Sequence, residues 1–127
     1  MLPLLLLCIG ASLGAIARWQ LSLWLNPGGL LPWGTLACNL VGGYLIGLLV
    51  AIFQAMPEID PVWRLALVTG FLGALTTFST FSIETVSLLQ DNRPGQALML
   101  AAVHLLGSLA LTWAGLRMGA WWIASRV

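Results

Sequence analysis

The 127-residue sequence has very few charged side chains: four acids, five arginines and no lysine. Charged residues make up 7% of the chain, against about 25% in a typical soluble protein. So few charges cannot coat a soluble domain of this length, which excludes water as its main solvent. The net charge of +1 provides no basic field for nucleic acid, so we exclude nucleic acid as a partner.

The sequence is also poor in residues that usually carry catalysis. Its two cysteines, Cys8 and Cys38, lie inside apolar runs and are expected to be small buried hydrophobic residues rather than a disulfide or a metal site. Its one histidine, His104, has no ligand-spaced cysteine, histidine or acid in its own segment. The sequence contains no nucleophile paired with a base and no phosphate-binding loop, so we do not expect an enzyme.

What the sequence has in abundance is long apolar segments. A spanning helix needs about 20 mostly apolar residues, and four segments meet this length: Leu4–Leu25, Trp33–Ala55, Val62–Leu89 and Ala97–Ile123. Turn-forming residues separate them at 26–29, 57–61 and 91–95. Tryptophans, which favour the membrane interface, stand near the predicted ends at positions 24, 33, 63, 121 and 122. We therefore predict an all-α membrane protein in which residues 1–127 form one domain of four transmembrane helices.

Arginines are distributed almost evenly between the two sides of the membrane. With four spans, Arg64, Arg117 and Arg126 share one side, and Arg18 and Arg93 the other. Loops rich in lysine and arginine normally stay in the cytoplasm, so this weak bias favours insertion in both orientations. An antiparallel homodimer of two inverted copies would follow. The alternative is that one extra arginine, or another protein, decides the orientation.

The third span carries an unusual polar stretch at its centre. Residues 76–82 read Thr-Thr-Phe-Ser-Thr-Phe-Ser, after glycines at Gly70 and Gly73. Glycines, β-branched threonines and hydroxyls that compete for backbone hydrogen bonds all weaken a helix, so we predict a break here. Freed carbonyls at a break inside a membrane commonly coordinate a cation. The alternative is an intact helix whose hydroxyls bond to its own carbonyls.

Other polar or aromatic residues in the spans have two interpretations each. Phe78 and Phe81 share a helix face and either pack in a core or turn their positive ring edges toward an anion. Asn39, the only asparagine inside the second span, needs a partner, which an interhelical hydrogen bond would supply. Glu84 is either functional or bonds hydroxyls or helix ends near the polar stretch.

The fourth and first spans add further polar candidates. His104, Ser108 and Thr112 recur every four residues, which predicts one polar stripe that faces protein or water. If His104 faces a pore, its charge change near neutral pH would tune conductance. Arg18 follows a long apolar run and is expected to reach an interface or a wet vestibule, where it would concentrate anions.

Three stretches resemble the bacterial fluoride channels of the CrcB, or Fluc, family. They are Gly-Ala-Ile-Ala-Arg at 14–18, Gly-Thr-Leu-Ala-Cys-Asn-Leu-Val-Gly-Gly at 34–43, and Gly-Phe-Leu-Gly at 70–73 leading into the polar stretch. The likeness runs over essentially the whole chain. It implies a fluoride-selective channel in the cell (inner) membrane, which exports fluoride passively and protects the cell from its toxicity.

The resemblance also implies an assembly and a set of roles. An antiparallel dual-topology homodimer would hold two pores and a structural sodium ion on its axis, bound by the carbonyls of Gly73 and Thr76. Phe78 and Phe81 would line each pore, and Asn39 would be a nearby amide donor. Thr80, Ser108 and Thr112 would form a polar track, and Arg18 would lie in the vestibule. Leu100 and His104 depart from the family, which often has tyrosine and serine there.

Two other functions remain open. A proton-coupled exporter similar to the small multidrug transporters would also be short and four-spanned, but it needs an acid in its first span, and only Glu84 in the third could replace it. A non-conducting structural subunit is the other possibility, if the polar residues only hold helices together.

Overall fold

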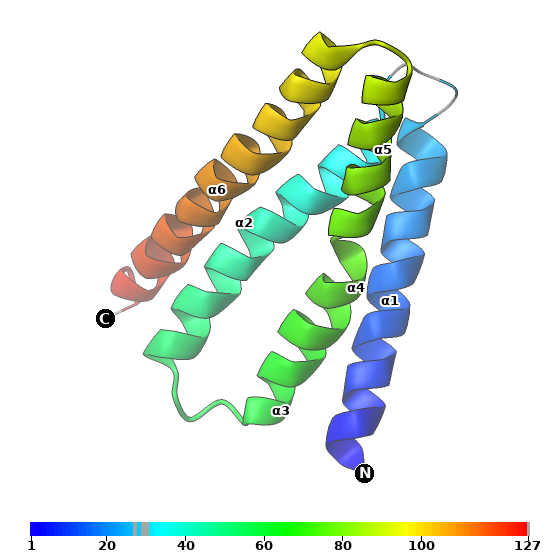
Figure 1. The fold of residues 1–127 in the computed structure, drawn as a ribbon. Coiled ribbons are helices and arrows are strands. Elements are labelled where there is room, and N and C mark those ends of the chain that lie inside the picture. Colours follow the sequence, from blue (N-terminus) through cyan, green and yellow to red (C-terminus); the bar gives the residue numbers. More distant parts are fainter. Residues whose placement is uncertain (27, 29–30, 127) are drawn as a thin grey trace.

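The computed structural model, which describes residues 1–26, 28 and 31–126, is built from helices joined by short connections (Figure 1). The first, second and last long helices are α1 (Leu2–Leu25), α2 (Trp33–Ala55) and α6 (Pro94–Ala124). The third segment is divided into α3 (Pro61–Arg64), η1 (Leu65–Leu72), α4 (Gly73–Leu75) and α5 (Phe78–Gln90). The four segments are long and apolar enough to cross a membrane, which confirms the predicted spans to within three residues at each end.

Local sequence signals explain where the helices begin. Pro61 and Pro94 start α3 and α6, since proline lacks the N–H that a first turn leaves unbonded. Asp60 caps α3, where its Oδ1 accepts the N–H of Val62 at 2.9 Å. Before α2, Oδ1 of Asn26 accepts the N–H of Gly34 at 2.8 Å. Of the turn predicted at 26–29, Pro27 and Gly29 lie outside the described residues.

The helices pack in pairs, α2 against α6 and α1 against η1 and α4. Glycines allow these close approaches: a methyl group on Gly47 would collide with the carbonyl of Thr112, and one on Gly115 with the carbonyl of Tyr44. The backbones of α2 and α6 therefore touch reciprocally. Gly10 and Gly14 give α1 the same closeness to the third segment. These glycines thus let the helices pack backbone against backbone.

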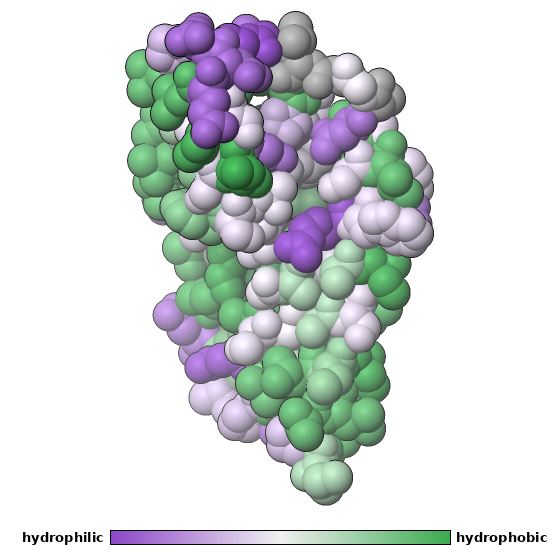
Figure 2. All heavy atoms as spheres, turned by 45° about the vertical axis from the view of Figure 1, so that its right-hand side comes forward, coloured by the Kyte–Doolittle hydropathy of each residue, from purple (hydrophilic) through white to green (hydrophobic). Residues whose placement is uncertain are grey.

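Cys38 lies in the core, where it packs with Leu72 and Leu75. The expectation that both cysteines are buried is right for Cys38 and wrong for Cys8, which is exposed on α1 because none of the described residues covers that part of the helix. Large apolar side chains are exposed along all the long helices, as a lipid-facing surface requires. Figure 2 shows one face, on which apolar areas alternate with neutral ones and a few hydrophilic patches, and polar residues gather at the end that carries the α5–α6 turn.

Both chain ends lie away from the α5–α6 turn, the N-terminus at the foot of α1 and the C-terminus at the far end of α6 (Figure 1). This arrangement follows from an even number of spans. The tryptophans at 24, 33, 63 and 121 are largely exposed near helix ends, in agreement with the predicted boundaries. The chain is therefore a multi-pass membrane protein.

The third segment is broken near its centre, as predicted. Thr76 and Thr77 are extended, with ψ values of 153° and 114°, between α4 and α5. The preceding helix is already irregular, because η1 is π-helical and the N–H of Gly73 reaches back to the carbonyl of Val68. Such π-helical turns are rare and are often found at functional sites.

Candidate functional site

The break is held in place by one side chain from a neighbouring helix. Oδ1 of Asn39, on α2, accepts the N–H of Thr77 at 2.8 Å, and Nδ2 of Asn39 donates to the carbonyl of Thr77 at 3.1 Å. The carboxamide of Asn39 therefore bonds both the N–H and the carbonyl of Thr77, an extended residue between α4 and α5. The interhelical hydrogen bond considered for Asn39 is confirmed. Unpaired, these backbone groups would be costly inside a membrane.

Backbone carbonyls lose their usual helical donors at the break, and those of Gly73 and Thr76 are among them. In a continuous helix the N–H of Thr77 would bond to the carbonyl of Gly73, and the N–H of Thr80 to that of Thr76. Here Thr77 donates to Asn39, and Thr80 donates to the hydroxyl of Thr77 at 3.2 Å. The carbonyl oxygens of Gly73 and Thr76 are thereby released from helical bonding.

A cluster of hydroxyls surrounds the start of α5. Thr77 is 7% exposed and caps the helix, since its Oγ1 accepts the N–H of Thr80. The same hydroxyl lies 3.0 Å from Oγ1 of Thr80 and 3.3 Å from Oγ of Ser79. Further along α5, Ser82 and Thr85 donate to carbonyls one turn earlier. The hydroxyl-to-carbonyl bonding considered as an alternative thus occurs within α5, beside the break rather than instead of it.

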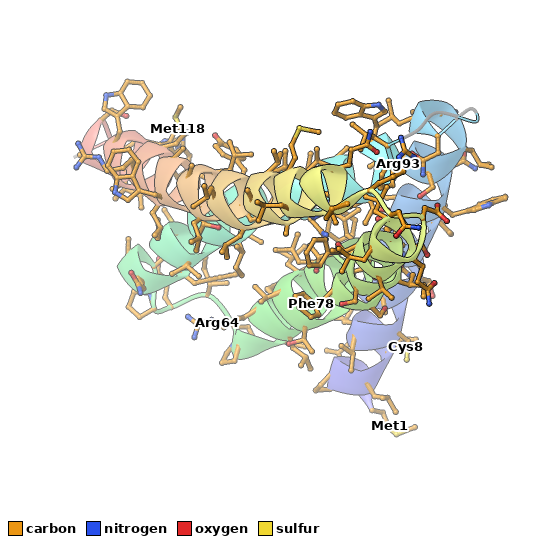
Figure 3. The ribbon with its side chains drawn as sticks, turned by 45° about the horizontal axis from the view of Figure 1, so that its top comes forward. Met1, Cys8, Arg64, Phe78, Arg93 and Met118 are labelled. Carbon is orange, nitrogen blue, oxygen red and sulfur yellow. The ribbon has the colours of Figure 1, made fainter. Side chains whose placement is uncertain are left out.

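Three rings form a stack next to this cluster. The ring centroids of Phe78 and Phe81 are 5.4 Å apart with a tilt of 53°, and those of Phe81 and His104 are 4.6 Å apart. Nδ1 of His104, on α6, lies 3.2 Å from Nδ2 of Asn39. Phe78 is 79% exposed and lies between the ends marked by Arg64 and Arg93 (Figure 3). The stack therefore runs from the chain's surface to its buried network.

A groove of about 510 Å³ opens beside the break, between α2, the third segment and α6. It brings together seven of the residues singled out in the sequence: Asn39, Gly73, Thr76, Phe78, Phe81, His104 and Ser108. None of the described residues that line it carries a full charge, apart from the ionisable ring of His104. The groove is therefore an uncharged and mainly apolar surface at mid-membrane depth, with a few polar side chains and two phenylalanine rings in its lining.

Four predicted residues lie outside the groove lining. Thr80 belongs to the hydroxyl cluster, and Thr112 packs against Gly43 between α2 and α6. Arg18 is half-buried on α1. Glu84 is partly buried on α5 and accepts a 2.6 Å hydrogen bond from the hydroxyl of Thr35 through Oε1.

Sequence reasoning missed two residues of this network. Thr77 was part of the polar stretch but had no role of its own, although a threonine three residues before Thr80 fits an N-cap position. Thr35 lay inside the stretch at 34–43 and was given no role. No sequence signal pairs Thr35 with Glu84, 49 residues away.

Together, the fold and the groove define a small multi-pass membrane protein with an uncharged groove inside the bilayer, in which a few polar side chains meet two phenylalanine rings. The sequence model described as "CrcB-like protein, Camphor Resistance (CrcB)" matches residues 5–116. The chain is 63% identical over 117 residues to a Variovorax paradoxus protein named "Fluoride-specific ion channel FluC", covering 92% of this chain and 94% of that one. Proteins of the same name from Albidiferax ferrireducens and Bordetella petrii are 61% and 60% identical, over 98% and 91% of this chain and 95% and 89% of theirs.

These matches extend over nearly the full chain, so it belongs to the CrcB (Fluc) family. The resemblance found in the sequence is confirmed. The family is one of ion channels and not of enzymes.

Proposed function

We propose that the chain is a fluoride-selective channel that lets fluoride leave the cell passively across the inner membrane and so protects the cell from its toxicity. The observation that carries this proposal is the convergence of a broken helix, uncharged donors and phenylalanine rings on one intramembrane groove. The relatives named fluoride-specific channels support the choice of ion.

The groove chemistry suits a small, strongly hydrated anion. A pore must replace the water that fluoride loses, and hydroxyls, ring edges and N–H groups can do so without a fixed charge that would hold the ion too tightly. Phe78, Phe81, His104 and Ser108 offer such groups along the groove, with Asn39 fixing its wall. Thr80 and Thr112 continue the polar track, and Arg18 draws anions into the vestibule.

The groove is open along one side in a single chain, and the largely exposed Phe78 stands at its edge. A second, inverted copy would close it and produce two equivalent pores related by a two-fold axis. The near balance of arginines between the two sides favours such a dual-topology pair.

A structural sodium ion would fit at the released carbonyls. Oxygen atoms are the ligands that hard cations prefer, and broken helices in membranes often supply them. Gly73 and Thr76 have lost their helical donors and both line the groove. Two inverted copies would contribute four such oxygens to one ion on the dimer axis.

The test is fluoride release from liposomes that contain the purified protein, followed with a fluoride electrode. Phe81→Ile removes the ring that links Phe78 to His104, so we expect fluoride flux to fall at least about tenfold, or roughly 1.4 kcal/mol. Leu106→Ile, on the exposed face of α6, is the matched control and should conduct normally. Chloride should pass far more slowly than fluoride.

Three outcomes would contradict the proposal. Equal passage of chloride and fluoride would show that the protein is not selective for fluoride. Normal fluoride flux through the Phe81→Ile variant would show that the ion does not pass through the groove. Dependence of fluoride flux on an imposed proton gradient would identify a coupled exporter instead.

A further inference from the structure

His104 is a buried side chain beside the groove, at the meeting point of three helices. Its side chain is 5% exposed on α6, with Nδ1 against Asn39 of α2 and its ring against Phe81 of α5. Its other nitrogen, Nε2, is buried and has no hydrogen-bond partner among the described residues. Buried polar atoms without partners are uncommon and usually indicate a strained site or a missing ligand.

The protonation of the ring follows from Asn39. The backbone N–H of Thr77 can only donate and its carbonyl can only accept, so the two bonds to Thr77 fix which end of the Asn39 amide is oxygen and which is nitrogen. Nδ2 therefore faces His104, and its second hydrogen points at Nδ1. Nδ1 must accept, which places the single ring proton of neutral His104 on Nε2.

We infer that His104 works as this neutral Nε2–H tautomer, with a separate task for each nitrogen. Nδ1 positions the Asn39 amide that holds the break at Thr77, and Nε2–H is a donor that hydrogen-bonds fluoride as the ion passes Phe81. The first task depends only on the hydrogen bonds described here. The second rests on the proposed channel function, because it needs fluoride in the groove that His104 lines.

The charged form of His104 does not fit this network. An imidazolium carries a proton on both nitrogens, so its Nδ1–H would meet the N–H of Asn39 head-on. Of the ionisable groups on the elements around it, Glu84 of α5 is bonded through Oε1 to Thr35, and Cys38 of α2 lies in the core with Leu72 and Leu75. Neither is a partner of His104, so its charge would remain uncompensated.

Because the chain has a single histidine, one isotope label tests the inference directly. The full-length protein labelled with ¹⁵N-histidine is examined by NMR in lipid nanodiscs at neutral pH, with His104→Gln as the assignment control. We expect an unprotonated Nδ1 and a protonated Nε2. Sodium fluoride should shift the Nε2 signal and its proton, and sodium chloride at the same concentration should not.

Each result has a distinct meaning. A proton on Nδ1, or on both nitrogens, would overturn the inference, whatever the flux. The expected tautomer without a response to fluoride would overturn the donor task alone, provided that the same preparation conducts fluoride in liposomes. Absence of fluoride conduction would contradict the proposed function. In that case the protonation of the two ring nitrogens would still show whether Nδ1 positions Asn39.

Two substitutions separate the roles of the ring. His104→Gln keeps a neutral N–H near the position of Nε2 and an acceptor for Asn39, so it should retain most of the fluoride flux. His104→Phe keeps a ring of similar shape without polar atoms and should lose at least about tenfold. Amide hydrogen exchange at Thr77 should quicken in the Phe variant and stay slow in the Gln variant. Equal flux and equal exchange in the two variants would refute both tasks.

Discussion

The hydroxyl of Thr35 on α2 donates a hydrogen bond of 2.6 Å to Oε1 of Glu84 on α5. The other carboxylate oxygen of Glu84 is buried and lacks a partner among the described residues, so the acid depends on Thr35. Thr35→Val keeps the shape of the side chain and removes the donor. We expect a loss of about 1–3 kcal/mol in stability, measured by thermal unfolding in detergent.

Thr35→Ser is the matched control, since it keeps a hydroxyl and should stay close to the wild type. A Val variant as stable as the Ser variant would mean that Glu84 is solvated from another direction.

Asn39 permits a second residue-scale prediction. Asn39→Asp can still accept from the N–H of Thr77 but cannot donate to the Thr77 carbonyl or to His104. A carboxylate facing a carbonyl oxygen inside a membrane is strongly unfavourable. We expect fluoride flux to be abolished and the melting temperature to fall, both measured on one preparation. An Asp variant with wild-type flux would show that the amide clamp is dispensable.

Sequence reasoning at this scale identified candidates but not their partners. It proposed an interhelical bond for Asn39 because an amide in an apolar helix must be satisfied. It could not identify Thr77 as the partner, because the two groups bonded are backbone atoms freed only when the helix breaks. The tautomer of His104 depends in turn on that bond, so no residue pattern encodes it.

At the scale of the helix, the start of α5 depends on the side chain of Thr77. Thr77→Val leaves the backbone clamp to Asn39 possible but removes the cap that accepts the N–H of Thr80. Losing such a cap costs about 0.5–2 kcal/mol, so the variant should unfold at lower temperature. Thr77→Ser keeps the hydroxyl and should have a melting temperature close to that of the wild type. A Val variant with the wild-type melting temperature would show that the cap does not stabilise the protein.

The reciprocal glycine contacts between α2 and α6 give a further prediction. Gly47→Ala would force its new methyl group into the carbonyl of Thr112, and the packed backbones leave no flexible side chain to yield. We expect a loss of about 1–3 kcal/mol, with poorer yield of monodisperse protein in size-exclusion chromatography. Gly95→Ala is the control and should behave as the wild type. A methyl group added there meets no described atom within 4 Å beyond its own stretch of helix.

The helices and the break were predictable because they depend on local composition. Apolar length defined the four spans, and glycines with clustered hydroxyls predicted a break in the polar stretch, which the structure places at residues 76–77. The π-helical turn of η1 was not predicted, since no residue in 65–72 demands it. It lies where α1 approaches through Gly10 and Gly14, so its geometry belongs to the packing of two helices that are far apart in sequence.

For the whole molecule, the proposed dual topology makes a prediction about charge. Three lysines added after the C-terminus would bias one orientation, and three added in the turn at 91–95 would bias the other. Because an antiparallel pair needs both orientations, each variant alone should conduct fluoride weakly. Co-expression should restore the flux, measured in liposomes from each preparation.

Weak conduction by the co-expressed pair, or full conduction by either variant alone, would contradict the antiparallel arrangement. The matched control adds three glutamines at the same positions, which lengthens the chain equally without charge.

The clamp between Asn39 and Thr77 has the bonding pattern of a single rung between two β-strands, with a side chain replacing one peptide unit. Because both bonds go to the same residue, Thr77, they fix the position of the break in the sequence. Rewinding the third segment into a continuous helix would require both bonds to be broken. In the proposed channel the rim of the passage would be a rigid frame, and the direction of fluoride movement would be set by the concentrations of the ion on the two sides together with the membrane potential. A passage that stays assembled in this way would let fluoride leave quickly, because no conformational change would have to precede each passage of the ion.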